Sequence, residues 1–158
     1  MRTRSTFADR SQPVPTLLFF PTVDIVQFIE KTVTDANVLG FVETMFGRKR
    51  YIPEIHSNNP AIRASAERAA FNFPIQGTEA DILKKAMTLL YKYIQSDIPN
   101  AAIVLTVHDE LVCEVPEKDA QAFAHDMKGI MENIIKLDAP LITDVGIGTT
   151  WGDIQGLV

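Results

Sequence analysis

The sequence predicts an α+β domain in which helices cover a small antiparallel sheet. The first observation is a pair of apolar runs on either side of His108-Asp109-Glu110 that alternate with a period of two, as antiparallel strands do. The second is a set of segments with helical spacing that lie between such hairpins along the chain. The third is the composition. Of 158 residues, 46% are hydrophobic and 22% are charged, which is typical of a globular protein.

Residues 1–20 show no sustained period and contain Pro13 and Pro15. We expect them to be a poorly ordered lead-in to one domain over residues 21–158. No linker or repeat divides the rest of the chain, and its length is enough to bury a substantial core.

The next elements follow from apolar spacing and from glycine. Apolar side chains recur at helical spacing over residues 22–39, and Gly40 is the expected stop of this helix. Two short strand-like runs, 41–46 and 50–55, surround Gly47 and predict a hairpin.

The middle of the chain predicts two helices separated by a proline. Asn59 is a good N-cap and Pro60 suits the first helical position, so a helix should run from there and end before Pro74. Thr78, with Asp81 three residues later, resembles the capping box of a further helix that runs to about residue 95.

The last third predicts a strand pair, a helix and a final strand. The paired strands are residues 103–107 and 111–115, with Asp109 and Glu110 at the tip of the turn between them. A helix should run from 116 to about 135, and a strand should cover 141–148.

The single cysteine, Cys113, excludes an internal disulfide and a zinc site built from several cysteines. It lies in an apolar strand pattern, which favours a buried structural thiol. No run of about 18 apolar residues occurs, so no membrane-spanning helix is predicted. The apolar patch at residues 17–20 is too short for a signal peptide, and the expected location is the cytoplasm.

Charge is distributed unevenly along the chain, whose net charge is −5. Residues 41–92 hold eight Lys or Arg against five Asp or Glu, whereas residues 93–158 hold three against eleven. This asymmetry suits a protein with one basic face for a polyanion and an acidic site elsewhere. Two differently solvated surfaces would give the same pattern, so charge alone does not decide.

Asp109 and Glu110 are two adjacent carboxylates on a tight turn. A rigid turn of this kind supplies the hard oxygen ligands that Mg²⁺ and Mn²⁺ prefer. A solvent-exposed acidic turn is common and fits the same pattern. One turn does not satisfy Mg²⁺ by itself, and the sequence shows no partner carboxylate in an evident position.

Several long segments resemble, in order and spacing, the signature motifs of family A DNA polymerases, the DNA polymerase I type. The third signature of that family is matched by TVHDELVCEVPE, at residues 106–117. The other matching segments are GFVETMFGRKRYIPEI (40–55), AERAAFNFPIQGTEADILKKAM (66–87) and, as the C-terminal strand, PLITDVGIGTTW (140–151). Three separate long motifs in the correct order are a specific signal.

The resemblance implies a right-handed polymerase architecture, of which this chain would be the C-terminal palm portion with adjoining fingers segments. The implied activity is template-directed DNA synthesis in replication and repair, with primer–template DNA and deoxynucleoside triphosphates as partners. Asp109 would be one of two aspartates that hold two Mg²⁺ (or Mn²⁺) ions. Glu110 would assist at the metals, and His108 would lie against the primer terminus.

The resemblance also implies a DNA-binding role for Arg68, Asn72 and Gln76, which match family residues that contact primer and template in the minor groove. Minor-groove acceptors are nearly the same for every base pair, so these donors can check pair geometry without reading sequence. The alternatives are a surface ion pair of Arg68 with Glu67 or another acidic residue and a turn role for Gln76. The run Arg48-Lys49-Arg50 fits a phosphate-facing patch and structural ion pairs equally well.

Two departures from the family are minor: Thr106 replaces a common Gln, and Glu79 replaces a common small residue. The upstream aspartate motif and the triphosphate-binding fingers helix have no counterpart in residues 1–20. The chain would then be a truncated product, an excised portion or a split subunit, and in the last case a separate polypeptide would carry the rest of the polymerase. We expect the isolated chain to be inactive. The alternative is a non-catalytic DNA-binding or interaction remnant that keeps the palm fold. A stand-alone two-metal nuclease would require a second carboxylate cluster.

Overall fold

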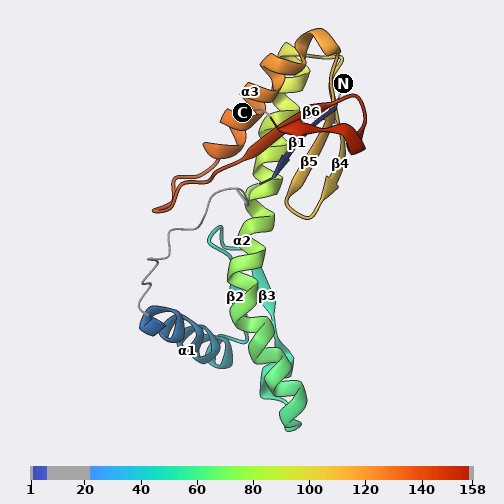
Figure 1. Cartoon of the computed structure of the whole chain (residues 1–158). Helices are drawn as coiled ribbons and strands as arrows, with labels where there is room; N and C mark the ends of the chain where they lie inside the picture. The colour runs from blue at the N-terminus through green and yellow to red at the C-terminus, as the bar shows by residue number, and fades with distance from the viewer. Residues whose placement is uncertain (1, 7–21, 157–158) are drawn as a thin grey trace. The chain divides into compact units, whose positions relative to one another are not determined.

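The computed structural model describes residues 2–6 and 22–156, which form two compact units (Figure 1). One unit combines the N-terminal strand with the chain from Ile82 onward, and the other extends from the first helix to Asp81. No helix in these two ranges has the length and apolar character needed to cross a membrane.

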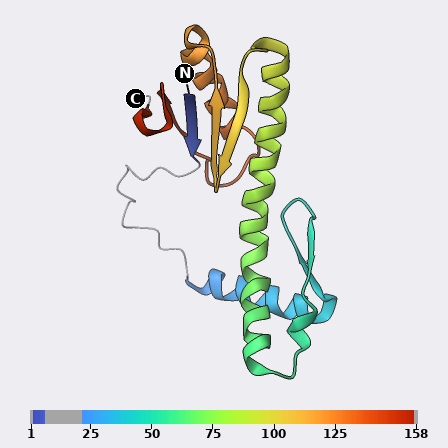
Figure 2. The ribbon, with the colours of Figure 1, turned by 90° about the vertical axis from the view of Figure 1, so that its right-hand side faces the viewer.

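The first unit contains a five-stranded antiparallel sheet with the strand order β4-β5-β1-β6-β7 (Figure 2). Its strands are β1 (Arg2–Thr6), β4 (Ala102–Val107), β5 (Glu110–Glu114), β6 (Asp144–Gly148) and β7 (Gln155–Gly156). The first strand of the chain therefore lies in the centre of the sheet, paired on both sides. Short 3-10 turns precede α3 and β7, at Glu117–Asp119 and Trp151–Asp153.

The core of this unit lies between β5 and two helices, α3 (Ala120–Glu132) and the later part of α2 (Pro60–Asp97). Phe123, Leu90 and Leu111, one from each of these elements, are fully buried. The two helices are also joined by a hydrogen bond from Tyr93 Oη to Asp126 Oδ2.

The second unit consists of α1 (Thr22–Leu39), a hairpin of β2 (Phe41–Glu43) and β3 (Lys49–Tyr51), a 3-10 turn at Pro53–His56, and the first part of α2. Gly40 ends α1 with a φ of 75°, a left-handed conformation that glycine adopts without steric cost. The core residues come from every element except β3: Ala36, Val42, Ile52, Ile55, Ala66 and Ala70, with Phe73 packed against them.

The predicted α+β class is confirmed, as are the helix over residues 22–39 and the antiparallel hairpin around residue 109. The hairpin between residues 41 and 55 is present, but its strands are shorter than predicted because the chain turns into a 3-10 turn at Pro53. The helix predicted from 116 begins as a 3-10 turn and becomes α3 at Ala120.

The prediction of two helices separated at Pro74 is wrong. Residues 60–97 form one continuous helix, and Pro74 lies inside it. Thr78 is consequently no N-cap, and its hydroxyl donates to the carbonyl oxygen of Pro74 one turn earlier. An interior proline removes one backbone hydrogen bond and costs about 3 kcal/mol, so other contacts must hold the two sides of α2 in line.

The prediction of a poorly ordered lead-in fails for Arg2–Thr6, which form β1. Backbone pairing with β5 on one side and β6 on the other explains a strand that has no apolar alternation of its own. The rest of the predicted lead-in, residues 7–20, falls outside the described residues. The domain boundary at residue 21 stays a prediction.

Candidate nucleic-acid interface and catalytic turn

The acidic turn between β4 and β5 is tighter than the sequence predicted. Val107 pairs with Glu110, so the turn consists of His108 and Asp109, and Glu110 is the first residue of β5. His108 has a φ of 53° and is the only non-glycine residue with a positive φ in the described part of the chain. A two-residue hairpin turn that matches strand twist requires this left-handed conformation, which costs a non-glycine residue about 1–2 kcal/mol.

The turn has a rigid support because β5 is buried directly after it. Leu111, Val112 and Cys113 are at most 2% exposed. Asp109 is half-buried, His108 is exposed, and neither side chain has a hydrogen-bond or ion-pair partner among the described residues. A carboxylate with free oxygens on a fixed backbone is suited to bind a cation.

The donor set at this turn fits Mg²⁺ or Mn²⁺ in part. Both ions prefer oxygen ligands, and Mg²⁺ commonly takes one or two carboxylates together with waters and substrate phosphates. Asp109 and Glu110 supply such carboxylates. Within residues 2–6 and 22–156, no group of three or more His, Cys, Asp or Glu side chains has the arrangement of a metal site.

The three predicted DNA contacts, Arg68, Asn72 and Gln76, lie exposed on α2 in the other unit. Because α2 continues through Pro74, their spacing of four and eight residues is true helical spacing. They fall within a stripe about 80° wide and about 12 Å long. None of the three side chains has a hydrogen-bond or ion-pair partner in the described residues, and the alternative ion pair between Arg68 and Glu67 is not formed there.

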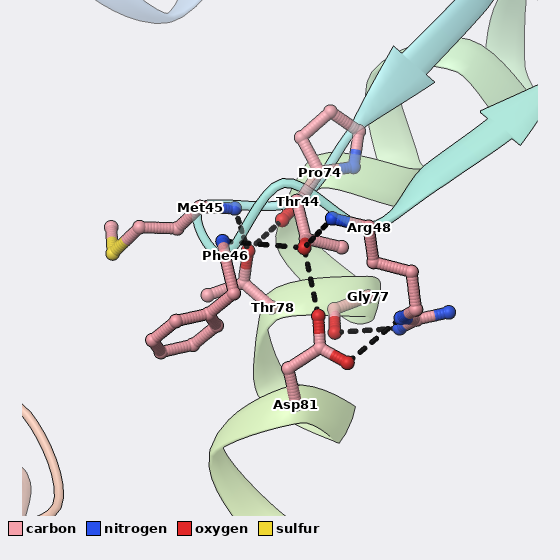
Figure 3. A network of polar contacts seen from close by, with 8 residues as sticks. All are labelled: Thr44, Met45, Phe46, Arg48, Pro74, Gly77, Thr78 and Asp81. Atoms are coloured by element: carbon pink, nitrogen blue, oxygen red, sulfur yellow. Dashed lines mark hydrogen bonds and ion pairs between the residues drawn. The ribbon is translucent and has the colours of Figure 1, made fainter.

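The turn of the β2–β3 hairpin is fastened to α2 by a polar network that we call the hairpin clamp, formed by Thr44, Arg48, Gly77, Thr78 and Asp81 (Figure 3). The Asp81 carboxylate accepts one hydrogen bond from Thr44 Oγ1 at 2.7 Å and another from Arg48 Nε at 2.8 Å. Arg48 Nη2 donates to the Gly77 carbonyl oxygen at 2.9 Å.

Three further hydrogen bonds, all donated by backbone N–H groups of the hairpin turn, belong to the hairpin clamp. The backbone N–H of Met45 donates to Thr78 Oγ1 at 2.9 Å. Thr44 Oγ1 also accepts the backbone N–H groups of Phe46 and Arg48, so one buried hydroxyl fixes the turn and its contact with α2 together.

The basic run Arg48-Lys49-Arg50 had two open interpretations, and the structure separates its members. Arg48 is a structural residue: it pairs with Asp81, and its guanidinium carbon lies 5.1 Å from the ring centroid of Phe73. Lys49 Nζ lies 4.1 Å from the ring centroid of Phe41, and the guanidinium carbon of Arg50 lies 5.7 Å from that of Phe73. Both of these side chains are exposed, and a phosphate contact for them stays a prediction.

Sequence reasoning missed the roles of Thr44 and Asp81. Asp81 was interpreted as the capping partner of Thr78, whereas its carboxylate binds residues 33 and 37 positions away. No local pattern in the sequence indicates contacts at such separations.

Burial raises the pKa of the Cys113 thiol to about 12, so the thiol stays protonated at neutral pH. The predicted structural thiol is thus confirmed. We expect native protein to react with an aromatic disulfide reagent at least about a hundredfold more slowly than protein unfolded in guanidinium, because the thiolate is the nucleophile and needs access. Equal rates of absorbance change in the two states would contradict this.

With this geometry established, comparison with known proteins identifies the family. The sequence matches the profile of DNA polymerase family A over residues 17–153, which includes both the acidic turn and the exposed stripe on α2. The chain belongs to DNA polymerase family A.

Its relatives include DNA polymerases I of bacteria. The chain is 43% identical over 129 residues to DNA polymerase I of Pseudomonas aeruginosa, an alignment that covers 82% of this chain and 14% of the relative. It is 44% identical over 124 residues to the thermostable DNA polymerase I of Thermus aquaticus, covering 78% and 15%. The chain therefore spans about one seventh of the length of these curated relatives.

A solved structure resembles the chain as well. It is the POL domain of Pol1 from M. smegmatis, in complex with DNA primer-template and dNTP. The TM-score is 0.77 at 39% sequence identity, and the match covers 80% of this chain and 22% of that one.

Proposed function

We propose that the chain is the C-terminal palm portion of a DNA polymerase I-type enzyme and contributes to template-directed DNA synthesis. The observation that carries the proposal is the family match through residues 17–153, which includes the two-residue turn of His108 and Asp109 and the strand residue Glu110 directly after it. The solved relative bound to primer-template and dNTP supports the same partners for this chain.

Asp109 is the proposed catalytic metal ligand, and Glu110 assists beside it. Two divalent cations, Mg²⁺ or Mn²⁺, would activate the primer 3′-hydroxyl and stabilise the leaving pyrophosphate when bound. The role of Asp109 is to hold its carboxylate at a fixed position, which the buried strand β5 supports. His108, exposed at the same turn, is the proposed contact to the primer terminus.

Arg68, Asn72 and Gln76 form the proposed minor-groove contact. Their stripe, about 12 Å long by helical rise, matches the length of three to four base-pair steps at about 3.4 Å each. Free donors on one helix face can reach the acceptors that every base pair presents in the minor groove.

The remaining parts of the active site, including the triphosphate-binding helix, are proposed to lie outside these 158 residues, and on a separate polypeptide if the polymerase is split. A two-metal site needs carboxylates on both sides of the metal pair, and within residues 2–6 and 22–156 the turn at Asp109 is the proposed source of one side. Because the substrates are cellular DNA and deoxynucleoside triphosphates, the proposed location is the cytoplasm.

Primer–template binding tests the proposed DNA interface. Arg68→Ala is expected to weaken the binding of a labelled primer–template duplex by about 1–3 kcal/mol, measured by fluorescence anisotropy at low, stated salt. Arg63→Ala is the matched control, since Arg63 is exposed on the same helix about 140° away from Arg68. It should retain the affinity of the unmodified chain. Equal affinities for the two variants would remove Arg68 from the interface.

A further inference from the structure

The exposed stripe of Arg68, Asn72 and Gln76 spans the turn of α2 at Pro74, where one backbone hydrogen bond of the helix is missing. Pro74 lies between Asn72 and Gln76 and has no N–H to donate to the carbonyl of Ala70. The Thr78 hydroxyl donates to the Pro74 carbonyl, a contact that often bends helices. A bend at this point would turn Gln76 away from Arg68 and Asn72.

The β2–β3 hairpin contacts α2 on both sides of that turn. Before Pro74, the hairpin residue Val42 belongs to the same buried cluster as Ala66 and Ala70. After Pro74, the hairpin clamp binds Gly77, Thr78 and Asp81. The residues that follow Asn72 and Gln76 directly in the chain, Phe73 and Gly77, both contact Arg48.

The clamp contact is close because residue 77 has no side chain. A Cβ at Gly77 would lie 2.6 Å from Thr44 Cγ2, and 3.3 Å from both Arg48 Nη2 and Phe73 Cε2. The Asp81 side chain is 12% exposed, so its two hydrogen bonds are largely shielded from water. Backbone approach and shielded polar contacts therefore fix the hairpin at one position along α2.

We propose that the β2–β3 hairpin holds α2 straight at the Pro74 turn, a role that we call a splint. Thr44, Arg48 and Asp81 are positioning residues that keep Gln76 in line with Arg68 and Asn72. They thereby set how strongly a mismatched primer terminus is rejected. This inference rests on the proposed DNA-binding function of the stripe. The physical reason is that minor-groove checking depends on several donors meeting acceptors of successive base pairs at once, which a bent helix does not allow.

The first test measures the helix without DNA. Spin labels on Ile62→Cys and Glu79→Cys, both exposed sites in one unit, span about 25 Å of α2 across Pro74, in a Cys113→Ala background. Pulsed electron spin resonance should give one narrow distance distribution for the unmodified clamp. Asp81→Asn and Gly77→Ala should broaden or shift it. An unchanged distribution in both variants overturns the splint.

Matched variants separate the clamp from general damage to the fold. Asp35→Asn removes an exposed ion pair, 2.7 Å from Lys31 Nζ, in the same unit and should leave the distribution narrow. Thr44→Ser keeps the hydroxyl that binds Asp81 but removes the Cγ2 atom that a Cβ at residue 77 would meet. Adding Thr44→Ser to Gly77→Ala should therefore restore the narrow distribution. Failure of this rescue contradicts the steric part of the proposal.

The second test measures rejection of a mismatch as the ratio of Kd values for mismatched and matched primer–template duplexes. Asp81→Asn should lower this ratio by about threefold to tenfold, the size expected for one lost hydrogen bond. In a Gln76→Ala background the same substitution should have no further effect, because the clamp acts through Gln76. A purely structural role would give equal losses in both backgrounds and would overturn the proposal.

Loss of the DNA interface and loss of the positioning role give different results. If Arg68→Ala and Gln76→Ala leave both Kd values unchanged, the proposed DNA interface fails, whatever the spin-label distances are. If these two variants lower affinity while Asp81→Asn leaves the mismatch ratio unchanged, the interface stands and only the positioning role is wrong.

Discussion

Purified alone, the chain is expected to extend no primer in the presence of Mg²⁺ or Mn²⁺. The acidic turn is the proposed source of ligands for one side of a metal pair, and within residues 2–6 and 22–156 no group of three or more His, Cys, Asp or Glu side chains could hold a metal ion. The charge of an incoming triphosphate would also lack the basic residues that offset it in the transition state. Together these deficits correspond to several powers of ten in rate.

Activity should appear when the chain is combined with a family A polypeptide that carries the upstream aspartate motif and the fingers helix. Primer extension on a labelled template measures it, and Asp109→Asn should lower the restored rate at least about a thousandfold, which is roughly 4 kcal/mol of transition-state stabilisation. Asp138→Asn is the paired control, because Asp138 is exposed in the same unit and lies outside the turn. It should retain full activity.

Two results would contradict these expectations, one for the missing partner carboxylate and the other for the catalytic role of the chain. Robust synthesis by the chain alone, abolished by Asp109→Asn, would mean that the chain holds its own partner carboxylate. Tight binding of primer–template without any activity after combination would identify the chain as a non-catalytic DNA-binding remnant.

Phe123→Ala is expected to lower the free energy of unfolding of the sheet-containing unit by about 3–5 kcal/mol. Phe123 is fully buried against Leu90 and Leu111, so truncation removes transfer free energy and leaves a cavity. Denaturant unfolding followed by the fluorescence of Trp151, the only tryptophan, reports on this unit. A shift below about 1 kcal/mol would show that the core around Phe123 collapses to fill the space.

Tyr91→Ala is the control for this prediction. It removes an aromatic side chain from α2 in the same unit, but Tyr91 is 58% exposed and should contribute less than about 1 kcal/mol. Because Leu111 belongs to the core of Phe123 and lies two residues after Asp109, Phe123→Ala should also loosen the acidic turn. Faster amide exchange at residues 109–111 would report this effect.

Local signals were sufficient where neighbours along the chain determine the structure. Apolar spacing and Gly40 placed α1 and its end, and the period of two placed β4 and β5. The turn itself was harder to predict, since it has only two residues, His108 and Asp109, and contains no glycine. Glu110 therefore lies in the strand and not at the tip.

Long-range contacts account for the errors. Proline propensity predicted a break at Pro74, but α2 is continuous there, and the β2–β3 hairpin is the proposed support for that turn. Arg48 of the same hairpin forms an ion pair with Asp81 of α2, and only the folded chain reveals this pairing. The residue types of the candidate site and their helical spacing could be predicted from the sequence. The contacts that support these residues, the hairpin clamp and the buried strand β5, could not.

The central position of β1 constrains how the sheet-containing unit folds during synthesis. β1 pairs with β5 and β6, whose residues are synthesised more than 100 positions after those of β1. Contacts at such separation carry a large loop-closure cost and form slowly. Until β6 is available, β1 presents an open edge that can pair with another chain. The partly formed sheet is thus prone to aggregation until β6 pairs with β1.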